Sequence, residues 1–187
     1  MPKKPEILST KTVARTNIFT IERMQLRFEN GCEVEYERIV SPPGGAVLIV
    51  PQLNDTTLLL IREYCGGMQR YEIAFPKGRV ENNESIPESA NREIMEEIGY
   101  GAKHLEHIKT VSVSPGYNNH QTHIVFATDL YENRLEGDEP EMLEVIPWDI
   151  NKLDQLLQNK EFTEARSIAA LFLLQHRFSP AGKISNE

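Results

Sequence analysis

Residues 78–100 read GRVENNESIPESANREIMEEIGY, a glutamate-rich stretch with its own helix signals. Within it, Ser85 is followed three residues later by Glu88, which is the sequence pattern of a helix capping box. Gly99 follows the last residue of the periodic apolar run and suits the end of a helix. The stretch therefore predicts a helix over about residues 86–98.

One face of this expected helix is acidic. Glu93, Glu96 and Glu97 are spaced i, i+3 and i+4, so they share a face, and their like charges repel unless a cation neutralises them. Mg²⁺ and Mn²⁺ prefer such oxygen ligands and keep waters that a phosphate can replace. The alternative is a solvated acidic face, which is common in so acidic a chain. The adjoining apolar stripe predicts packing against a core and comprises Ile86, Ala90, Ile94 and Ile98.

The spacing of these residues resembles the signature of the Nudix hydrolases. That pattern is Gly, five residues, Glu, seven residues, then Arg-Glu-apolar-any-Glu-Glu-any-Gly-apolar, and every fixed position is matched. The resemblance implies an α/β/α sandwich with a mixed sheet, and Mg²⁺-dependent or Mn²⁺-dependent cleavage of nucleoside diphosphates linked to another group. The matching residues are Gly78, Glu84, Arg92, Glu93, Ile94, Glu96, Glu97, Gly99 and Tyr100.

The resemblance also implies roles for the side chains of the motif. Glu96 and Arg92 are expected to take part in catalysis, with Arg92 pairing with a carboxylate such as that of Glu84 and thereby orienting the ligands. The expected metal ligands within the motif region are the carboxylates of Glu93, Glu97 and Glu96 and the backbone carbonyl of Lys77.

A second acidic cluster lies in the loop LEGDEPE at 135–141. The resemblance implies that a carboxylate from this loop activates water or binds a further metal ion. We expect Glu139 to act as the general base and Glu141 to bind metal, although either could reach the attacking water. A solvated loop is the alternative.

Segments outside the motif indicate a branch of the family. Pro115, 16 residues after Gly99, and the segments 61–64 and 71–78 resemble the ADP-ribose pyrophosphatase branch. Lys77 stands where that branch usually has alanine, and Phe-Pro-Lys-Gly is frequent among diadenosine polyphosphate hydrolases. The layout is most like the bacterial hydrolases of ADP compounds, which implies ADP-ribose, NADH and diadenosine polyphosphates as substrates and AMP as a product.

Four residues are candidates for substrate binding. Arg62 and Arg38 are expected to contact phosphate or ribose, because arginine forks suit diphosphate oxygens, although surface arginines are more often merely solvated. From the resemblance, Glu72 and Pro115 are expected to contribute as well.

Three other functions stay open at this point. Lys77 and Tyr117 favour a hydrolase whose main substrates are diadenosine polyphosphates. A sensor that binds ADP-ribose without cleaving it would have no need of the intact carboxylate cluster. Nucleic-acid decapping is disfavoured by the net charge of −8, which argues against a broad nucleic-acid-binding face.

The chain as a whole suits a small protein of the cytoplasm. Its 187 residues fit one domain, or one domain with a small appendage. Cys32 and Cys65 show no disulfide framework and no metal-ligand spacing, which suits a reducing compartment. The longest apolar runs are far shorter than the roughly 18 residues that a membrane span needs, so we expect a soluble protein without a membrane partner.

The first 43 residues are expected to form a β subdomain, and residues 44–187 the hydrolase domain. Asn30-Gly31 between two alternating runs predicts a hairpin with a type I′ turn. Such a hairpin is marginal alone, and the resemblance implies a two-fold homodimer in which residues 1–40 contact the other subunit. A hairpin folded back on its own domain is the alternative. Its apolar face comprises Leu26, Phe28, Val34 and Tyr36.

The remaining elements alternate, as expected for an α/β protein. Amphipathic patterns predict two helices near the C-terminal end, over about 149–158 and about 163–177, the second opened by Thr163. Strands are predicted at about 46–51, 56–62, 71–75, 106–114, 121–128 and 143–148.

Overall fold

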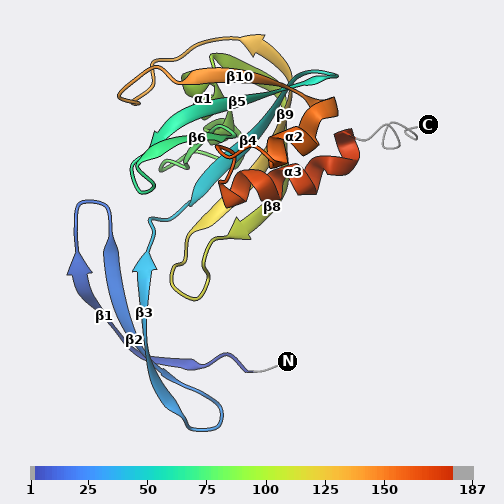
Figure 1. Ribbon diagram of the computed structural model, residues 1–187. Coiled ribbons are helices and arrows are strands. Elements are labelled where there is room, and N and C mark those ends of the chain that lie inside the picture. The colour runs from blue at the N-terminus through green and yellow to red at the C-terminus, as the bar shows by residue number, and fades with distance from the viewer. Residues whose placement is uncertain (1–2, 179–187) are drawn as a thin grey trace. The chain divides into compact units, whose positions relative to one another are not determined.

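The computed structural model describes residues 3–178 of the chain. It divides into two compact units, which are described separately (Figure 1). The first consists of Met1–Gly45 with Ser112–Gln121, and the second of Ala46–Val111 with Thr122–Glu187. The grouping of the 112–121 loop with the first unit was not foreseen, and the domain boundary near residue 43 stays a prediction.

The first unit is a three-stranded antiparallel sheet in the order β1-β2-β3. Its strands are β1 (Glu6–Arg15), β2 (Thr20–Arg27) and β3 (Glu33–Val40). The loop of the second unit's strand pair also joins it, since the Ile39 N–H donates to the Tyr117 carbonyl at 2.8 Å. The predicted β character of this region is confirmed.

The β2–β3 connection is the expected hairpin with a different turn. The Gly31 N–H donates to the Phe28 carbonyl at 2.9 Å, and Phe28 in turn pairs with Cys32. Of Asn30 and Gly31, only Gly31 has a positive φ, of 81°. The predicted type I′ turn is therefore wrong, because a three-residue loop needs the left-handed conformation only at its last position.

The two faces of this small sheet differ in polarity. On one face Leu26 lies opposite Val34, and Met24 lies opposite Tyr36, which is 43% exposed. The other face carries arginine–glutamate pairs, such as Arg23 with Glu37 at 2.8 Å. The unit thus has one face that is mainly apolar and one that is charged.

The second unit is built on a mixed seven-stranded sheet flanked by helices, which confirms the predicted fold class. The strands run in the order β10-β5-β4-β9-β8, with β6 paired to β5 and β7 to β4. The β4–β9 pair is parallel, whereas β4–β5, β4–β7, β5–β6 and β5–β10 are antiparallel. The strands are β4 (Ala46–Asn54), β5 (Thr57–Cys65), β6 (Arg70–Ala74), β7 (Lys77–Arg79), β8 (Tyr100–Ser112), β9 (Gln121–Glu132) and β10 (Glu144–Asp149).

Alternate residues of the central strands form two apolar clusters, one on each face of the sheet. Val47 and Ile49 of β4 pack with helix α1 (Ile86–Glu97), whereas Leu48 and Val50 pack with helix α3 (Ala165–Phe178). These strands are buried on both faces, so they read as continuous apolar runs. Their burial holds α1 in a fixed position on the sheet.

Several elements differ from the prediction, most clearly the two C-terminal helices and strand β8. The expected helix at 149–158 is a short 3₁₀ turn, Ile150–Lys152, followed by α2 (Leu153–Leu157). Strand β8 begins at Tyr100, directly after α1, rather than near residue 106. Helix α3 is opened by Glu164, not Thr163: the Ser167 N–H donates to Glu164 Oε2 at 2.8 Å, whereas the Thr163 hydroxyl donates to Glu72.

Within the described part of the chain, no helix combines the length and apolar character needed to cross a bilayer. Cys32 and Cys65 are both free thiols, as their spacing predicts.

Candidate active site

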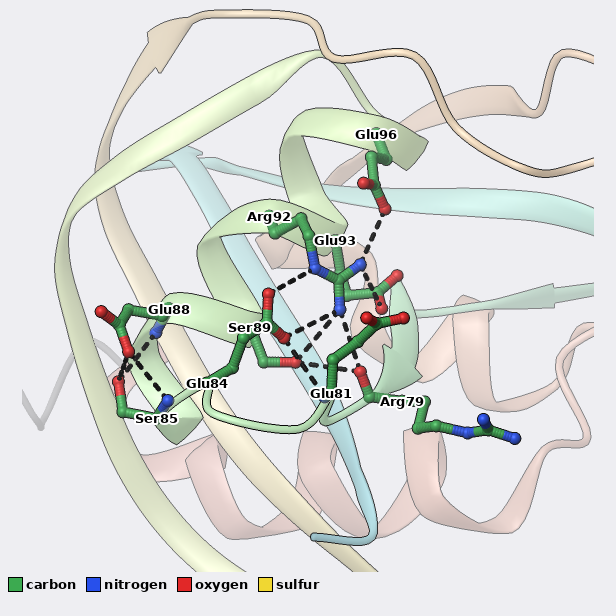
Figure 2. Close-up of polar contacts among 9 residues, drawn as sticks. All are labelled: Arg79, Glu81, Glu84, Ser85, Glu88, Ser89, Arg92, Glu93 and Glu96. Atoms are coloured by element: carbon green, nitrogen blue, oxygen red, sulfur yellow. Dashed lines mark hydrogen bonds and ion pairs between the residues drawn. The ribbon is translucent and has the colours of Figure 1, made fainter. Parts of the chain in front are cut away.

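Helix α1 positions the acidic side chains of the motif. The Ser85 side chain accepts a hydrogen bond from the Glu88 N–H, and the Glu88 carboxylate accepts from the Ser85 N–H, so the predicted capping box is confirmed (Figure 2). Ala90 and Ile94 on the adjoining side are fully buried against the sheet. One side of the helix therefore anchors it, and the next side presents carboxylates.

Glu93 and Glu97 lie against strand β7 and are largely removed from solvent, with 8% and 6% exposure. The Lys77 N–H donates to Glu97 Oε2 at 3.0 Å. At Gly78 an added Cβ would overlap the carboxyl group of Glu93. A side chain at this position would therefore displace the Glu93 carboxylate from the place that it occupies.

Burial leaves these two carboxylates short of positive charge. Desolvation raises the pKa of Glu93 to about 7 and that of Glu97 to about 8, and the nearby cations Arg92 and Lys77 oppose the rise only in part. Two buried carboxyl groups with raised pKa values, side by side on one helix, form a site that a divalent cation would stabilise.

Arg92 holds the cluster together. Its Nε and Nη2 donate to the two oxygens of Glu84 at 2.7 and 3.1 Å, its Nη1 to Glu96 at 2.9 Å, and its Nη2 to the Arg79 carbonyl at 3.0 Å (Figure 2). The predicted Arg92–Glu84 pair is confirmed, and it holds the pKa of Glu84 below its usual range. Arg92 Nη1 also lies 2.9 Å from Glu93 Oε1. The parts of Glu93, Glu96 and Glu97 as metal ligands stay predictions.

The side chain of Lys77 also reaches the cluster, which the sequence analysis missed. Its ammonium pairs with Glu63 of β5, and both side chains are more than four-fifths buried. The signal was present in the alternation of β5, where Leu59 and Ile61 face α1 and Glu63 follows at the same two-residue step. Lys77 therefore brings a second cation to the carboxylates.

The first residues of the acidic loop follow β9 in the chain and are hydrogen-bonded to the C-terminal end of α1. The Asn133 N–H donates to the Gly99 carbonyl at 3.0 Å and the Leu135 N–H to the Met95 carbonyl at 3.1 Å. Gly99 has a φ of 77°, and the Arg134 guanidinium lies only 2.8 Å from where its Cβ would be. These contacts fix the first residues of the loop beside Glu96.

The loop and the helix enclose two adjoining cavities. One of about 330 Å³ lies between the three α1 glutamates and residues 134–143, and one of about 680 Å³ extends from them to β7. Glu139 lines both, and desolvation together with neighbouring Glu63 and Asp138 raises its pKa. Glu141 lines the first cavity and accepts a hydrogen bond from the Tyr71 hydroxyl at 2.9 Å. The expected roles of Glu139 and Glu141 stay predictions.

The residues fit a divalent cation, although they would have to move to bind one. Across residues 3–178, no three His, Cys, Asp or Glu side chains converge as a ready-made metal site. The fit rests on the chemistry of the donors: two buried carboxyl groups of raised pKa, a glycine that makes room for one of them, and a cavity beside both.

The expected substrate-binding residues are not gathered in these cavities. Arg62 pairs with Glu144 and with Glu161, the latter at 3.0 Å, and Glu72 is buried against Arg70 and Thr163. Arg38 pairs with Glu22 at 2.9 Å in the first unit, which also contains Pro115. Their contacts with substrate stay predictions.

Comparison with known proteins agrees with this geometry. Residues 5–38 match the model of the NudE-type Nudix hydrolase N-terminal domain, and residues 42–172 match that of the NUDIX domain. The chain is 43% identical over 182 residues to ADP compounds hydrolase NudE of Escherichia coli K12, covering 97% of both chains. It is 29% identical over 175 residues to ADP-ribose pyrophosphatase of Bacillus subtilis 168, covering 90% of this chain and 94% of that one. A crystal structure of an ADP compounds hydrolase is similar with a TM-score of 0.89, 44% identity and 95% coverage of each chain.

Proposed function

Because the chain belongs to the Nudix hydrolase family and is a pyrophosphohydrolase, we propose that it hydrolyses the diphosphate bond of ADP compounds and releases AMP. The substrates would be ADP-ribose, NADH and diadenosine polyphosphates. One observation carries the proposal: Glu93 and Glu97 are buried side by side opposite Gly78, with raised pKa values. The names of the relatives in Escherichia coli and Bacillus subtilis support the substrate class.

The carboxylates of α1 would hold Mg²⁺, with Mn²⁺ as a substitute. Glu93 and Glu97 are the principal ligands, and Glu96, Glu141 and the Lys77 carbonyl are the further ones. When bound, the ion supplies positive charge that neutralises the diphosphate as negative charge develops on it. The raised pKa values support this assignment, because a cation binding there replaces protons that the buried groups otherwise retain.

The protein's own residues then position the reactants and move a proton. Glu139, whose pKa is raised, would accept a proton at its carboxylate from the attacking water. Arg92 would keep Glu84 and Glu96 in place by offsetting the repulsion between their like charges. Arg62, Glu72, Arg38 and Pro115 are proposed to hold the adenosine and ribose parts of the substrate.

A second candidate is a hydrolase whose main substrates are diadenosine polyphosphates. The Lys77 ammonium favours it, because the extra cation beside the carboxylates suits a more highly charged phosphate chain. A non-catalytic sensor of ADP-ribose is disfavoured, since a protein that only binds gains nothing from two buried carboxylates that repel the ligand.

A substrate panel tests the proposal. The purified protein would be incubated with Mg²⁺ and ADP-ribose, NADH or a diadenosine polyphosphate, with products separated by chromatography and kcat/KM measured for each. We expect AMP from all three classes, and none when a chelator removes the metal. Repeating the reaction in H₂¹⁸O would identify the attacked phosphorus. Absence of AMP from every compound would reject the proposed function.

The assembly proposed here is a two-fold homodimer. The apolar face of the β1–β3 sheet supports it, because Ile7 is 53% exposed and Tyr36 is 43% exposed within a single chain. Residues 1–40 would contact the other subunit and help line its adenosine site, with Arg38 nearest. The two free cysteines support a cytoplasmic location, where thiols stay reduced.

A further inference from the structure

Three basic residues line the larger cavity, and the side chains of two of them already have carboxylate partners. Lys77 is paired with Glu63, and Arg92 with Glu84 and Glu96. Arg79 is different: its side chain is exposed, and within residues 3–178 it forms no ion pair with a carboxylate. Within the described part of the chain, Arg79 is thus the one basic residue of this cavity that has no carboxylate partner.

The backbone of Arg79 is held in place, whereas its guanidinium is not. Arg79 lies opposite Ala46 in the β4–β7 pair, and its carbonyl accepts hydrogen bonds from Ser89 Oγ at 3.1 Å and Arg92 Nη2 at 3.0 Å. Figure 2 shows the guanidinium directed away from these contacts. Five N–H donors on a fixed base are suited to binding phosphate oxygens.

The position of Arg79 relative to Glu93 and Glu97, the proposed metal ligands, follows from the contacts between β7 and α1. Lys77 contacts Glu97 and Gly78 lies against Glu93, whereas the Arg79 carbonyl contacts the side chain one turn nearer the start of the helix. The scissile diphosphate would be bound at the carboxylates of Glu93 and Glu97. Arg79 therefore lies one residue further along β7 than this place, towards the start of α1.

The candidate substrates differ in what they carry beyond the scissile diphosphate. ADP-ribose and NADH have two phosphates joined to sugars, whereas diadenosine polyphosphates continue the phosphate chain. An added phosphate in a cavity lined by carboxylates is repelled unless a cation receives it. Resting on the proposed function, we propose that Arg79 binds phosphate oxygens outside the scissile diphosphate and so increases the preference for polyphosphate substrates.

The test compares Arg79→Ala and Arg79→Lys with wild type and with Lys109→Ala, which removes one charge from an exposed site on β8 outside both cavities. For Arg79→Ala we expect kcat/KM for diadenosine pentaphosphate to fall about 10–30-fold, and that for ADP-ribose by less than about threefold. Arg79→Lys should recover part of the loss, because an ammonium keeps the charge but not the fork. Lys109→Ala should match wild type on both substrates.

A second measurement does not depend on turnover. Calorimetric binding of inorganic tripolyphosphate and of pyrophosphate should show a preference for tripolyphosphate in wild type that Arg79→Ala loses. Equal losses on both substrates would overturn the inference, as would an unchanged tripolyphosphate preference. If wild type cleaved no ADP compound, the proposed function would fail, while the tripolyphosphate measurement would still decide the role of Arg79.

Discussion

Replacing Glu97 with glutamine should abolish turnover and, without metal, make the protein more stable at alkaline pH. Glu97 is 6% exposed, and its pKa in the folded protein is about 8, against 4.5 for an ordinary glutamate. A folded-state pKa above the unfolded one means that the folded protein retains the proton more tightly. Stability from this group is therefore fully present below pH 4.5 and is lost as the pH rises towards 8.

The magnitude follows from the same shift. Each pKa unit corresponds to about 1.4 kcal/mol, so the charged carboxylate costs about 5 kcal/mol above pH 8 as an upper limit. Glutamine removes this cost and can still accept the hydrogen bond from the Lys77 N–H, but its unpaired amide costs about 1–3 kcal/mol. We expect the Glu97→Gln variant to be more stable than wild type by about 2–3 kcal/mol at pH 8.5, and slightly less stable at pH 5.5.

The assay is urea unfolding of both proteins in a chelator at the two pH values, with Glu132→Gln, an exposed position on β9, as the control. In parallel, kcat with saturating Mg²⁺ should fall about a thousandfold, as expected for loss of several kcal/mol of charge stabilisation. A stability difference that does not change sign between pH 5.5 and 8.5 would refute the electrostatic reasoning. Retention of more than a tenth of the wild-type kcat would refute the assignment of Glu97 to the metal site.

The other predictions concern the loop, the arginine and the assembly. Glu139→Gln should lower kcat at least about 100-fold with little change in KM, and Glu141→Gln should raise the Mg²⁺ concentration needed for half-maximal rate. If Glu139→Gln turned over normally and Glu141→Gln were inactive, the two roles would be reversed. If both variants were active, the loop would be solvated and would have no catalytic role. Arg92→Lys should lower Mg²⁺ affinity or kcat about 10–100-fold, because a point charge cannot bridge Glu84 and Glu96, and wild-type values for both would contradict the positioning role. Light scattering at low micromolar concentration should give twice the chain mass, and a value near 21.4 kDa would reject the dimer. Deletion of residues 1–40 should raise KM for ADP-ribose sharply, so a truncated monomer with unchanged KM would reject a shared adenosine site.

What could be foreseen from the sequence was governed by local periodicity. The helix 86–98 and the common face of its glutamates follow from 3.6-residue spacing and a capping box, both of which depend on neighbours a few residues away. The Arg92–Glu84 pair was accessible for the same reason, since the two residues are eight apart and the cap fixes the chain between them. The 23 residues of the motif therefore contain most of the proposed metal-binding residues.

What could not be foreseen depends on contacts between distant segments. The alternation of β5 places Glu63 on the α1 face of the sheet, but its pairing with Lys77 joins two separate strands and has no local spacing. The contact of Tyr71 with Glu141 spans 70 residues of sequence and has none either. Thr163 has the composition of a helix cap, yet buried Glu72 takes its hydroxyl. Arg70 pairs with Oε1 of Glu72 and leaves Oε2 to the Thr163 hydroxyl, and a buried carboxylate oxygen without a hydrogen bond costs more than a weaker cap, so the tertiary contact prevails over the local preference.

The most direct test of the account is to locate the metal. Crystals grown with Mn²⁺ and an ADP-ribose analogue whose diphosphate bridge is a methylene group would be measured for anomalous scattering. The account predicts an ion about 2.0–2.3 Å from carboxylate oxygens of both Glu93 and Glu97, with the diphosphate against it. Ions bound only to the exposed carboxylates of the 135–141 loop, with no metal bound to Glu93 or Glu97, would contradict it.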